Sequence, residues 1–361
     1  MNRPLVVVAM SGGVDSSVAA ALLVEQGYRV IGMMLRLWSE TGTEESNRCC
    51  TPDSMAQARK VAQTLGIPFY TIDVRQRFFD TVVHYFLEGY RQGVTPNPCV
   101  VCNRVIRWGA LFDQARALGA EFLATGHYAR TKSGPDGEFL LLKGLDAEKD
   151  QSYVLSVLSQ NHLTHSLFPI GNFLKSHVRD LARRYDLPTA SRPDSQDLCF
   201  LAGGDYRSFL ERHIPESLRP GNIVNREGKI LGQHLGLAHY TIGQRKGIGI
   251  STTHPVYVLD KDIQNNLLIV GPREELGSDE MWVDELNWIG KSEPAKSFRA
   301  GVKIRYKAPE MPALITLTEN SLAHVQFESP LRDITPGQRA VFYQGEVCLG
   351  GGTIIKKGAK L

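Results

Sequence analysis

A short run of serine, glycine and aspartate, Ser11–Ser17, separates an apolar stretch from one with helical apolar spacing. Gly12 and Gly13 can adopt backbone angles closed to other residues, so their amides can turn toward one anion. The following stretch, 14–26, predicts a helix that ends before Gly27. An anion held by the loop would lie at the positive end of that helix. The pattern favours a phosphate-binding loop over the alternative, a simple tight turn.

The loop differs from a Walker loop, because no Gly-Lys-Ser/Thr sequence follows it. Without that lysine, it is better suited to hold a pyrophosphate that leaves than a γ-phosphate that is transferred. The string SGGVDSS resembles the PP-loop of ATP pyrophosphatases, enzymes that adenylate a substrate and release pyrophosphate. The motif therefore predicts adenylation as a first step, but no particular substrate.

Three cysteines are the second group of residues that could do chemistry. Cys99 and Cys102 lie in the string TPNPCVVC, whose two prolines discourage helix and strand and predict a loop. Cys199 follows a polar run far along the chain. The alternatives to catalytic thiols are buried structural thiols and a zinc site that also uses Cys49 and Cys50. Adjacent side chains seldom share one tetrahedral metal site, which disfavours zinc.

Composition limits the class of protein. The 361 residues are 42% hydrophobic and 22% charged, enough for substantial cores in two or three domains. The formal net charge of +3 is too small to indicate a nucleic-acid partner by itself. Six cysteines are too few for a disulfide scaffold in a chain of this length. Nothing resembles a signal peptide or a membrane span. The low cysteine content makes a reducing cytoplasm the expected location.

The first half of the chain alternates between predicted strands and helices. Strands are expected at 5–10, 28–38, 69–74 and 121–129, and helices at 14–26, 52–65, 78–90, 105–118 and 175–185. This alternation predicts a doubly wound parallel sheet, with ligands at the carboxyl ends of its strands. The glycine loop and Gly126-His127 both follow such ends, so we expect them to be neighbours.

Near residue 203, short strands with Gly- and Pro-rich turns replace the helices. From residue 274 onward this pattern predicts a small β-barrel. We therefore expect a multi-domain α/β protein with three parts. These are a Rossmann-like catalytic domain of doubly wound parallel sheet at 1–202, a small central domain at 203–273, and a C-terminal β-barrel at 274–361.

Over essentially its whole length the chain resembles the tRNA-specific 2-thiouridylase family, which places sulfur on C2 of the wobble uridine. The strings that carry this resemblance include AMSGGVDSS, TPNPCVVCNR, ATGHYAR, GLDAEKDQSYVL, RPDSQDLCF, HYTIGQRKGIGI, VKIRY and TPGQRAVFYQGEVCLGGG. The resemblance implies that ATP adenylates the C2 oxygen, which sulfur from a cysteine persulfide then replaces. Its implied cofactors are ATP and Mg²⁺. Its implied partners are tRNA and a persulfide donor, either a sulfur-relay protein or a cysteine desulfurase.

The resemblance also implies roles for individual residues. Cys199 would carry the persulfide and Cys102 would release its sulfur, which leaves a disulfide between them. The implied ATP-binding residues are Ala9, Met10, Ser11, Gly12, Gly13, Val14, Asp15, Ser16, Leu35 and Gly126, with Asp15 acting through Mg²⁺. The implied tRNA-binding residues are Asn97, Pro98, Cys99, His127, Lys149, Asp150, Gln151, Arg305, Tyr306 and Gln338.

Cys99 departs from the family pattern, because many members carry an acidic residue there. A general acid–base role at this position is therefore in doubt. Two interpretations stay open: Cys99 is an accessory thiol of a C-x-x-C pair, or Cys99, Cys102 and Cys199 hold an iron–sulfur cluster. Of these we prefer the persulfide route with an accessory thiol.

Two basic segments are expected to contact RNA. GQRKG (243–247) and VKIRYK (302–307) mix arginine and lysine with glycine or tyrosine, which suits phosphate contacts and base stacking, although solvated surface charge is the alternative. Two competing functions also follow from the sequence. One is another PP-loop enzyme, such as a synthetase that passes nitrogen to an adenylated small molecule or a different tRNA thiolase. The other is a non-catalytic RNA-binding protein built on the terminal barrel.

Overall fold

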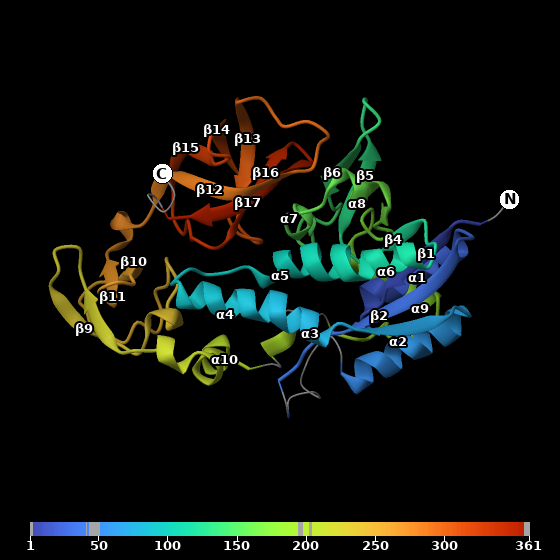
Figure 1. The fold of residues 1–361 in the computed structure, drawn as a ribbon, viewed down its shortest axis with the longest axis horizontal. Helices are drawn as coiled ribbons and strands as arrows, with labels where there is room; N and C mark the ends of the chain where they lie inside the picture. The colour runs from blue at the N-terminus through green and yellow to red at the C-terminus, as the bar shows by residue number, and fades with distance from the viewer. Residues whose placement is uncertain (1–2, 41, 43–50, 194–197, 202–203, 357–361) are drawn as a thin grey trace.

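The computed structural model describes residues 3–40, 42, 51–193, 198–201 and 204–356. Cys49 and Cys50, the additional zinc ligands considered above, lie outside these ranges. Figure 1 shows the N-terminal sheet and its helices at one end, the small central sheet at the other, and the barrel above the helical runs that join them. No helix within the described ranges is long and apolar enough to cross a bilayer.

A five-stranded parallel sheet forms the first part of the molecule. Its strands lie in the order β3 (Phe69–Asp73), β2 (Arg29–Arg36), β1 (Leu5–Ala9), β4 (Phe122–Ala124) and β7 (Ser166–Leu167). Successive side chains of a strand point to opposite faces, so Val6 and Val8 of β1 join one buried cluster and Val7 joins another. The central strand is therefore apolar on both faces.

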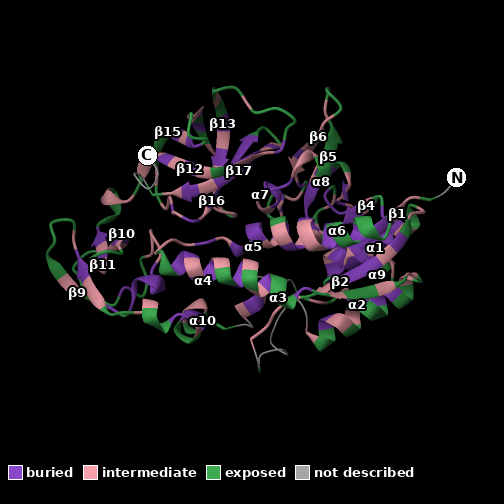
Figure 2. Ribbon diagram, viewed as in Figure 1, coloured by how far each residue is buried: buried purple, intermediate pink, exposed green. Residues whose placement is uncertain are grey.

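Helices cover both faces of this sheet. The cluster that contains Val6 is completed by residues of α1 (Val14–Glu25), α2 (Pro52–Leu65) and α9 (Lys175–Arg184). The cluster that contains Val7 includes Trp108 and Leu111 from a separate helical layer. Figure 2 shows the central strand β1 and the helix α1 largely buried and the outer face of α2 exposed. The predicted doubly wound parallel sheet is confirmed.

Two long helical runs lie side by side beneath the barrel (Figure 1). The first consists of α3 (Arg75–Phe78), η1 (Phe79–Val83) and α4 (His84–Arg91). The second consists of α5 (Pro98–Val101), η2 (Cys102–Leu111) and α6 (Phe112–Ala117). Both η1 and η2 are π-helical. Single π-helical segments inside α-helices occur often at functional sites.

The prediction of a loop around Cys99 and Cys102 is wrong, because Pro98 begins α5. Proline is tolerated at the first position of a helix, where its missing N–H would have no partner in the helix. Cys99 therefore lies in the first turn of a helix, and Cys102 begins the π-helical segment η2.

The central domain is a four-stranded sheet that follows η3 (Cys199–Leu201) and α10 (Tyr206–His213). Its strands lie in the order β10 (Tyr257–Asp262), β11 (Leu267–Gly271), β8 (Gly221–Val224) and β9 (Ile230–His234). Short 3-10 turns, η4 (Pro215–Ser217), η5 (Leu237–His239) and η6 (Arg273–Glu275), connect its parts. Ile223, Val258 and Leu268 form the centre of its core.

A closed six-stranded barrel ends the described chain, as predicted. Its strands are β12 (Ser278–Trp288), β13 (Ser297–Lys303), β14 (Met311–Leu317), β15 (Ala323–Leu331), β16 (Arg339–Gln344) and β17 (Val347–Ile355). Pairing of β12 with both β15 and β17 closes the barrel. A Cβ atom at Gly351 would lie 2.2 Å from the Ala340 carbonyl oxygen, so β17 needs glycine where it approaches β16.

A hairpin from the N-terminal half adds to this barrel and was not predicted. β5 (Ala129–Ser133) pairs with β6 (Phe139–Lys143), and β6 pairs in turn with β17. The short helices α7 (Ser152–Leu155) and α8 (Gln160–Thr164) follow the hairpin. The N-terminal part and the barrel therefore share one continuous sheet.

Candidate active site

The glycine loop joins β1 to α1 at the carboxyl edge of the parallel sheet. α1 begins after Gly13, and no side chain caps its first turn among the described residues. The first N–H groups of a helix lack partners within the helix and carry the positive end of its dipole. The fold therefore presents donors at this turn to an anion such as a phosphate.

Hydrogen bonds and close packing fix the shape of this loop. The Ser11 amide donates to Ser16 Oγ over 3.2 Å, and Ser16 Oγ donates to the Gly13 carbonyl over 3.2 Å. Gly12 has a φ of +73°, and a Cβ atom there would lie 2.2 Å from the Ser54 carbonyl oxygen at the start of α2. Only glycine suits this position, because both the backbone angle and the contact exclude a side chain.

The remaining residues predicted to bind ATP surround the loop. Met10 and Val14 are buried, and Ala9 is half-buried at the end of β1. Leu35 is half-buried near the end of β2. A Cβ atom at Gly126 would lie 2.7 Å from the backbone nitrogen at position 16, so the end of β4 touches the start of α1. The expectation that Gly126 and the loop are neighbours is confirmed.

Asp15 is bound by two side chains at this edge. Its carboxylate lies 2.7 and 2.8 Å from Lys175 Nζ and accepts a 2.8 Å hydrogen bond from the Tyr128 hydroxyl. Sequence analysis did not identify Lys175, which is 160 residues away in the chain. The signal for it is its place as the first residue of an amphipathic helix that covers the same face as α1.

The residues of the site suit a Mg²⁺ ion that is held jointly by one carboxylate and the phosphates of a bound nucleotide. Among the described residues, no group of three or more His, Cys, Asp or Glu side chains is placed to hold a metal. Mg²⁺ is usually bound by one or two carboxylates together with substrate phosphates rather than by a protein cage. The partly exposed Asp15 carboxylate can supply such a ligand once phosphates are present.

Arg192 connects the glycine loop to the segment that leads to Cys199. Its guanidinium donates to the Gly12 carbonyl over 3.2 Å and to Ser54 Oγ over 2.9 Å, and it forms a 2.8 Å ion pair with Asp53. Cys199 follows Arg192 by seven residues in the sequence.

Cys102 and Cys199 pack against the same buried apolar cluster. Both are half-buried, and the cluster is built from α3, η1, α4 and the residues around Phe200. The Phe200 ring lies 6.1 Å from Phe78 and 5.2 Å from Phe86, which holds the short helix that begins at Cys199. The structure thus places the two predicted catalytic cysteines in one neighbourhood.

Cys99 is exposed and lies beside other residues predicted to contact tRNA. Burial, assisted by the negative charges of Asp150 and Cys99, raises the pKa of Tyr306 to about 12. The Tyr306 ring lies 6.1 Å from that of Tyr153, whose hydroxyl is hydrogen-bonded by the Asn97 side chain. Pro98 is buried next to them. Tyr306 is therefore near enough to Cys99 to feel its charge, and Asn97 and Pro98 precede Cys99 directly in the chain.

His127 is buried and engaged at both ring nitrogens. Its Nδ1 lies 2.7 Å from Thr125 Oγ1, and its Nε2 lies 3.1 Å from Arg107 Nη1. Because a guanidinium can only donate, Nε2 accepts and Nδ1 carries the proton. Burial and the charge of Arg107 hold the pKa of His127 well below its usual value, so the ring is neutral. Contact between His127 and tRNA stays a prediction.

Asp150 is buried and organises the turn that contains it. Its carboxylate accepts hydrogen bonds from the Gly144 amide at 3.0 Å and from the Ser152 amide and hydroxyl at 3.1 and 3.0 Å. Lys149 and Gln151 flank it and are both half-buried. In this structure Asp150 fixes the turn between Gly144 and Ser152, and a direct tRNA contact of Lys149, Asp150 and Gln151 stays a prediction.

Arg305 and Gln338 each join two parts of the molecule. Arg305 Nη2 donates to the Ile242 carbonyl of the central domain over 3.2 Å and to Thr335 Oγ1 of the barrel. Gln338 Nε2 donates to the Thr95 carbonyl over 2.8 Å, ahead of α5. Both residues predicted to contact tRNA are therefore also structural links.

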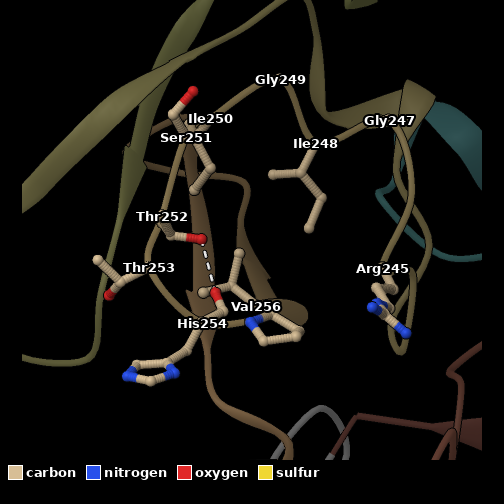
Figure 3. Close-up of a pocket in the computed structure, with 11 residues that line it drawn as sticks. Arg245, Gly247, Ile248, Gly249, Ile250, Ser251, Thr252, Thr253, His254 and Val256 are labelled. Carbon is tan, nitrogen blue, oxygen red and sulfur yellow. Dashed lines mark hydrogen bonds between the residues drawn. The ribbon is translucent and has the colours of Figure 1, made fainter.

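The predicted basic segment GQRKG borders a pocket in the central domain. Residues 245 and 247–256 line this pocket, whose volume is about 510 Å³. Figure 3 shows Arg245 and His254 on opposite sides of it. Arg245 and Lys246 are exposed, so their charges are accessible to an RNA backbone.

Cys348 represents the structural class of thiol. It is buried in the barrel, where burial raises its pKa to about 12. A thiol that stays protonated is inert as a nucleophile, which separates Cys348 from the cysteines near Phe200.

Three family models together match almost the whole chain. The model described as the tRNA methyl transferase HUP domain matches residues 4–203. Those described as the tRNA methyl transferase PRC-barrel domain and the aminomethyltransferase beta-barrel domain match residues 207–272 and 278–354. These descriptions name methyl transferases, whereas the curated relatives are named for thiolation.

The curated relatives match from end to end. tRNA-specific 2-thiouridylase MnmA 1 of Caldanaerobacter subterraneus subsp. tengcongensis is 46% identical over 98% of this chain and 98% of its own length. tRNA-specific 2-thiouridylase MnmA of Carboxydothermus hydrogenoformans is 45% identical over 99% of both chains. That of Chloroflexus aurantiacus is 47% identical over 97% of this chain and 98% of its own. Identity at this level over the full length shows that the chain belongs to the tRNA-specific 2-thiouridylase family.

Proposed function

We propose that this chain is an ATP-dependent tRNA-uridine 2-sulfurtransferase that thiolates C2 of the wobble uridine. The observation that carries the proposal is the combination of an uncapped helix start for phosphate with Cys102 and Cys199 packed on one apolar cluster. Arg192 links the two features along the chain. An enzyme that passes nitrogen to an adenylated molecule would have no use for these two thiols.

The first step is adenylation, because the C2 oxygen of uridine is a very poor leaving group. The oxygen attacks the α-phosphorus of ATP, the bond to the β-phosphate breaks, and pyrophosphate leaves. The α1 N-terminus and the loop from Ala9 to Ser16 hold the phosphates, while Leu35 and Gly126 line the adenosine. Bound Mg²⁺ would neutralise phosphate charge beside Asp15.

Sulfur transfer follows at C2. The terminal sulfur of a persulfide on Cys199 attacks C2 and AMP leaves with the original oxygen. The Cys102 thiolate then attacks the Cys199 sulfur, so that the sulfur–sulfur bond breaks and the terminal sulfur stays on the base. A disulfide between the two cysteines results. A dithiol reductant must reopen it when the donor is a persulfide, and hydrosulfide can reopen it directly to regenerate the persulfide.

The proposed tRNA-contacting residues are those around Cys99 and on the two basic segments. Asn97 and Pro98 directly precede Cys99, and Tyr306 is close enough to feel its charge, so the target base would lie at this exposed thiol. The chemistry needs tRNA and reduced thiols, so we propose a cytoplasmic location and a persulfide donor protein as partner. We further propose domain limits at 1–202, 203–273 and 274–361, supported by the parallel sheet, the four-stranded sheet and the closed barrel that these parts contain, with the hairpin β5–β6 of the first part extending the barrel sheet.

One experiment tests the proposal. The purified protein, with Cys102 and Cys199 first oxidised to their disulfide so that sulfide can open it to the persulfide, is incubated with ATP, unmodified tRNA and sodium sulfide. The digested nucleosides are then examined for 2-thiouridine by mass spectrometry. We expect thiouridine and pyrophosphate to form together, and neither to form with the Asp15→Ala variant. Pyrophosphate release without any thiolated nucleoside would instead favour a different PP-loop enzyme. RNA binding without pyrophosphate release would favour a non-catalytic role.

A further inference from the structure

The glycine loop contains no lysine, yet the fold places one beside it. Lys175 Nζ lies 2.7 and 2.8 Å from the two carboxylate oxygens of Asp15, in the first turn of α1. The Lys175 side chain is only 12% exposed, whereas that of Asp15 is 32% exposed. The ammonium group is thus held at the base of the phosphate loop by a carboxylate that remains partly open to solvent.

The position of Lys175 follows from the packing of two helices. Arg184 at the end of α9 forms a 3.0 Å ion pair with Glu25 at the end of α1, while Lys175 and Asp15 pair at their beginnings. α1 and α9 therefore run parallel, with both N-termini at the carboxyl edge of the sheet. The Lys175 amide also donates to Asp146 Oδ2 over 2.9 Å, which fixes the first residue of α9.

A lysine is poorly placed at these helix ends by electrostatics alone. The N-terminus of a helix carries partial positive charge, so a cation there is disfavoured, and here two N-termini converge. Asp15 offsets this repulsion and also the cost of burying the ammonium group. The two helix N-termini and Lys175 place positive charge at one point, and only the Asp15 carboxylate balances it. This site is suited to bind an anion with more negative charge than one carboxylate.

We infer that Lys175 is a phosphate-binding residue. Its ammonium group exchanges its ion pair with Asp15 for ionic contacts with the phosphates of ATP and with the pyrophosphate that leaves. The inference rests on the proposed function and adds to it the cation that the loop lacks. As the α–β bond of ATP breaks, negative charge accumulates on the pyrophosphate, and Lys175 stabilises that charge. The Asp15 carboxylate, released from its partner, is then available for a divalent cation.

The inference predicts opposite effects of the two partners on binding of Mg²⁺-free inorganic pyrophosphate. Lys175→Met keeps the apolar stem but removes the charge, so we expect affinity to fall about tenfold or more. Asp15→Asn removes the competing carboxylate, so we expect affinity to rise severalfold. Lys175→Arg should retain most of the wild-type affinity. Lys60→Ala, an exposed lysine on α2, serves as the matched control and should bind as wild type.

The measurement is titration calorimetry with pyrophosphate and with ATP at low ionic strength, together with the KM for ATP and kcat of tRNA-dependent pyrophosphate release. Because the leaving pyrophosphate carries more negative charge in the transition state than it does in bound ATP, Lys175→Met should lower kcat as well as raise the KM. Thermal unfolding of each variant controls for folding. If Lys175→Met fails to fold, two results still test the inference: the higher pyrophosphate affinity expected of Asp15→Asn and the near wild-type affinity expected of Lys175→Arg.

Wild-type affinity for pyrophosphate and ATP in a folded Lys175→Met protein would show that the ion pair is only structural. Equal losses of pyrophosphate affinity in Lys175→Met and Asp15→Asn would also overturn the inference. They would show that each substitution acts only by breaking the Lys175–Asp15 ion pair. These results differ from failure of the proposed function. In that case the wild-type protein binds nucleotide, with or without a Lys175 effect, and produces no thiouridine.

Discussion

The side-chain amide of Gln338 donates a 2.8 Å hydrogen bond to the backbone carbonyl of Thr95. The Thr95 amide in turn donates to the Pro336 carbonyl over 2.9 Å, and a Cβ atom at Gly337 would lie 2.8 Å from the Thr95 oxygen. The barrel turn thus holds both polar groups of one residue ahead of α5. Since α5 contains Cys99 and leads to Cys102, the barrel fixes where these thiols lie.

Gln338→Glu should disturb the cysteine helix, because a carboxylate has the same shape as the amide but cannot donate to a carbonyl. We expect a severalfold faster alkylation of Cys102, severalfold slower thiolation and unchanged ATP affinity. The lost hydrogen bond corresponds to about 1 kcal/mol. Gln344→Glu, on an exposed position of the same strand region, is the control. A change in tRNA affinity with no change in Cys102 alkylation would mean that Gln338 acts only on tRNA.

The N-terminal sheet could be predicted from the sequence, because a strand buried on both faces is recognised from a few consecutive apolar residues. Val6, Val7 and Val8 are apolar in succession, which only a strand buried on both faces requires, and the structure buries all three completely. The start of α2 was equally predictable: Thr51 caps it by accepting from the Ser54 amide, with proline at the first helical position.

The site could be predicted only in part, because its remaining contacts join distant residues. No periodicity pairs Asp15 with Lys175, and nothing in the short strands at 129–143 indicates that they extend the barrel. At Pro98, two prolines favoured a loop over a helix start, although one of them suits the first helical position. Whether such a segment forms a loop or a helix depends on tertiary contacts, here the hydrogen bonds between the barrel turn and Thr95.

Arg305 should contribute to tRNA binding through backbone charge. We expect Arg305→Ala to weaken tRNA binding and to flatten its log–log dependence on salt by about one unit, because one phosphate contact is lost. The measurement is tRNA affinity over a series of salt concentrations. Arg299→Ala, on the exposed face of β13, is the control. Because Arg305 also bonds Ile242 and Thr335, an unchanged salt slope with a lower melting temperature would assign it to domain packing instead.

The cysteine variants separate the persulfide route from an iron–sulfur cluster. If sulfur travels as a persulfide, Cys199→Ser should lose all thiolation, and Cys102→Ser should adenylate tRNA but fail to release sulfur. Cys99→Ser should keep substantial activity, because the exposed thiol only assists. Thiouridine and pyrophosphate are measured in parallel for each variant.

A cluster predicts a different pattern for the same variants. All three serine substitutions would then be equally inactive, and anaerobically prepared wild type would contain iron, labile sulfide and a visible charge-transfer band. A fully active Cys99→Ser protein without iron excludes the cluster. Equal loss in all three variants, with stoichiometric iron in the wild type, contradicts the persulfide route. The adenylation step is common to both.

Lys261 is buried at only 4% exposure, because it pairs across the sheet with Leu268 and so faces the core of the central domain. Within the described part of the chain its Nζ has no hydrogen-bond partner. Burial, opposed by the charge of Asp260, lowers the pKa of Lys261 from 10.5 to about 8. The nearby Lys356 bonds Asp260 and the Lys261 carbonyl, so a second cation lies close by. Lys261 therefore makes the folded state sensitive to pH.

The sign of this effect follows from proton counts. Between pH 8 and 10.5 the unfolded chain holds a proton on Lys261 that the folded chain has lost, so the contribution of this residue to the free energy of unfolding rises with pH. Below pH 8 both states are charged, and burial costs the fold up to about 3 kcal/mol. We therefore expect Lys261→Met to stabilise the protein by roughly 1–3 kcal/mol at pH 7, and the advantage to shrink as pH approaches 10.

Buried tyrosines such as Tyr153, whose pKa burial raises, destabilise the wild type and the Lys261→Met variant alike in alkali, so the difference in stability between the two proteins isolates the effect of the lysine. Urea unfolding of both proteins at pH 7, 8, 9 and 10 measures this difference. A difference that is constant across this range would show that Lys261 does not change its protonation on folding.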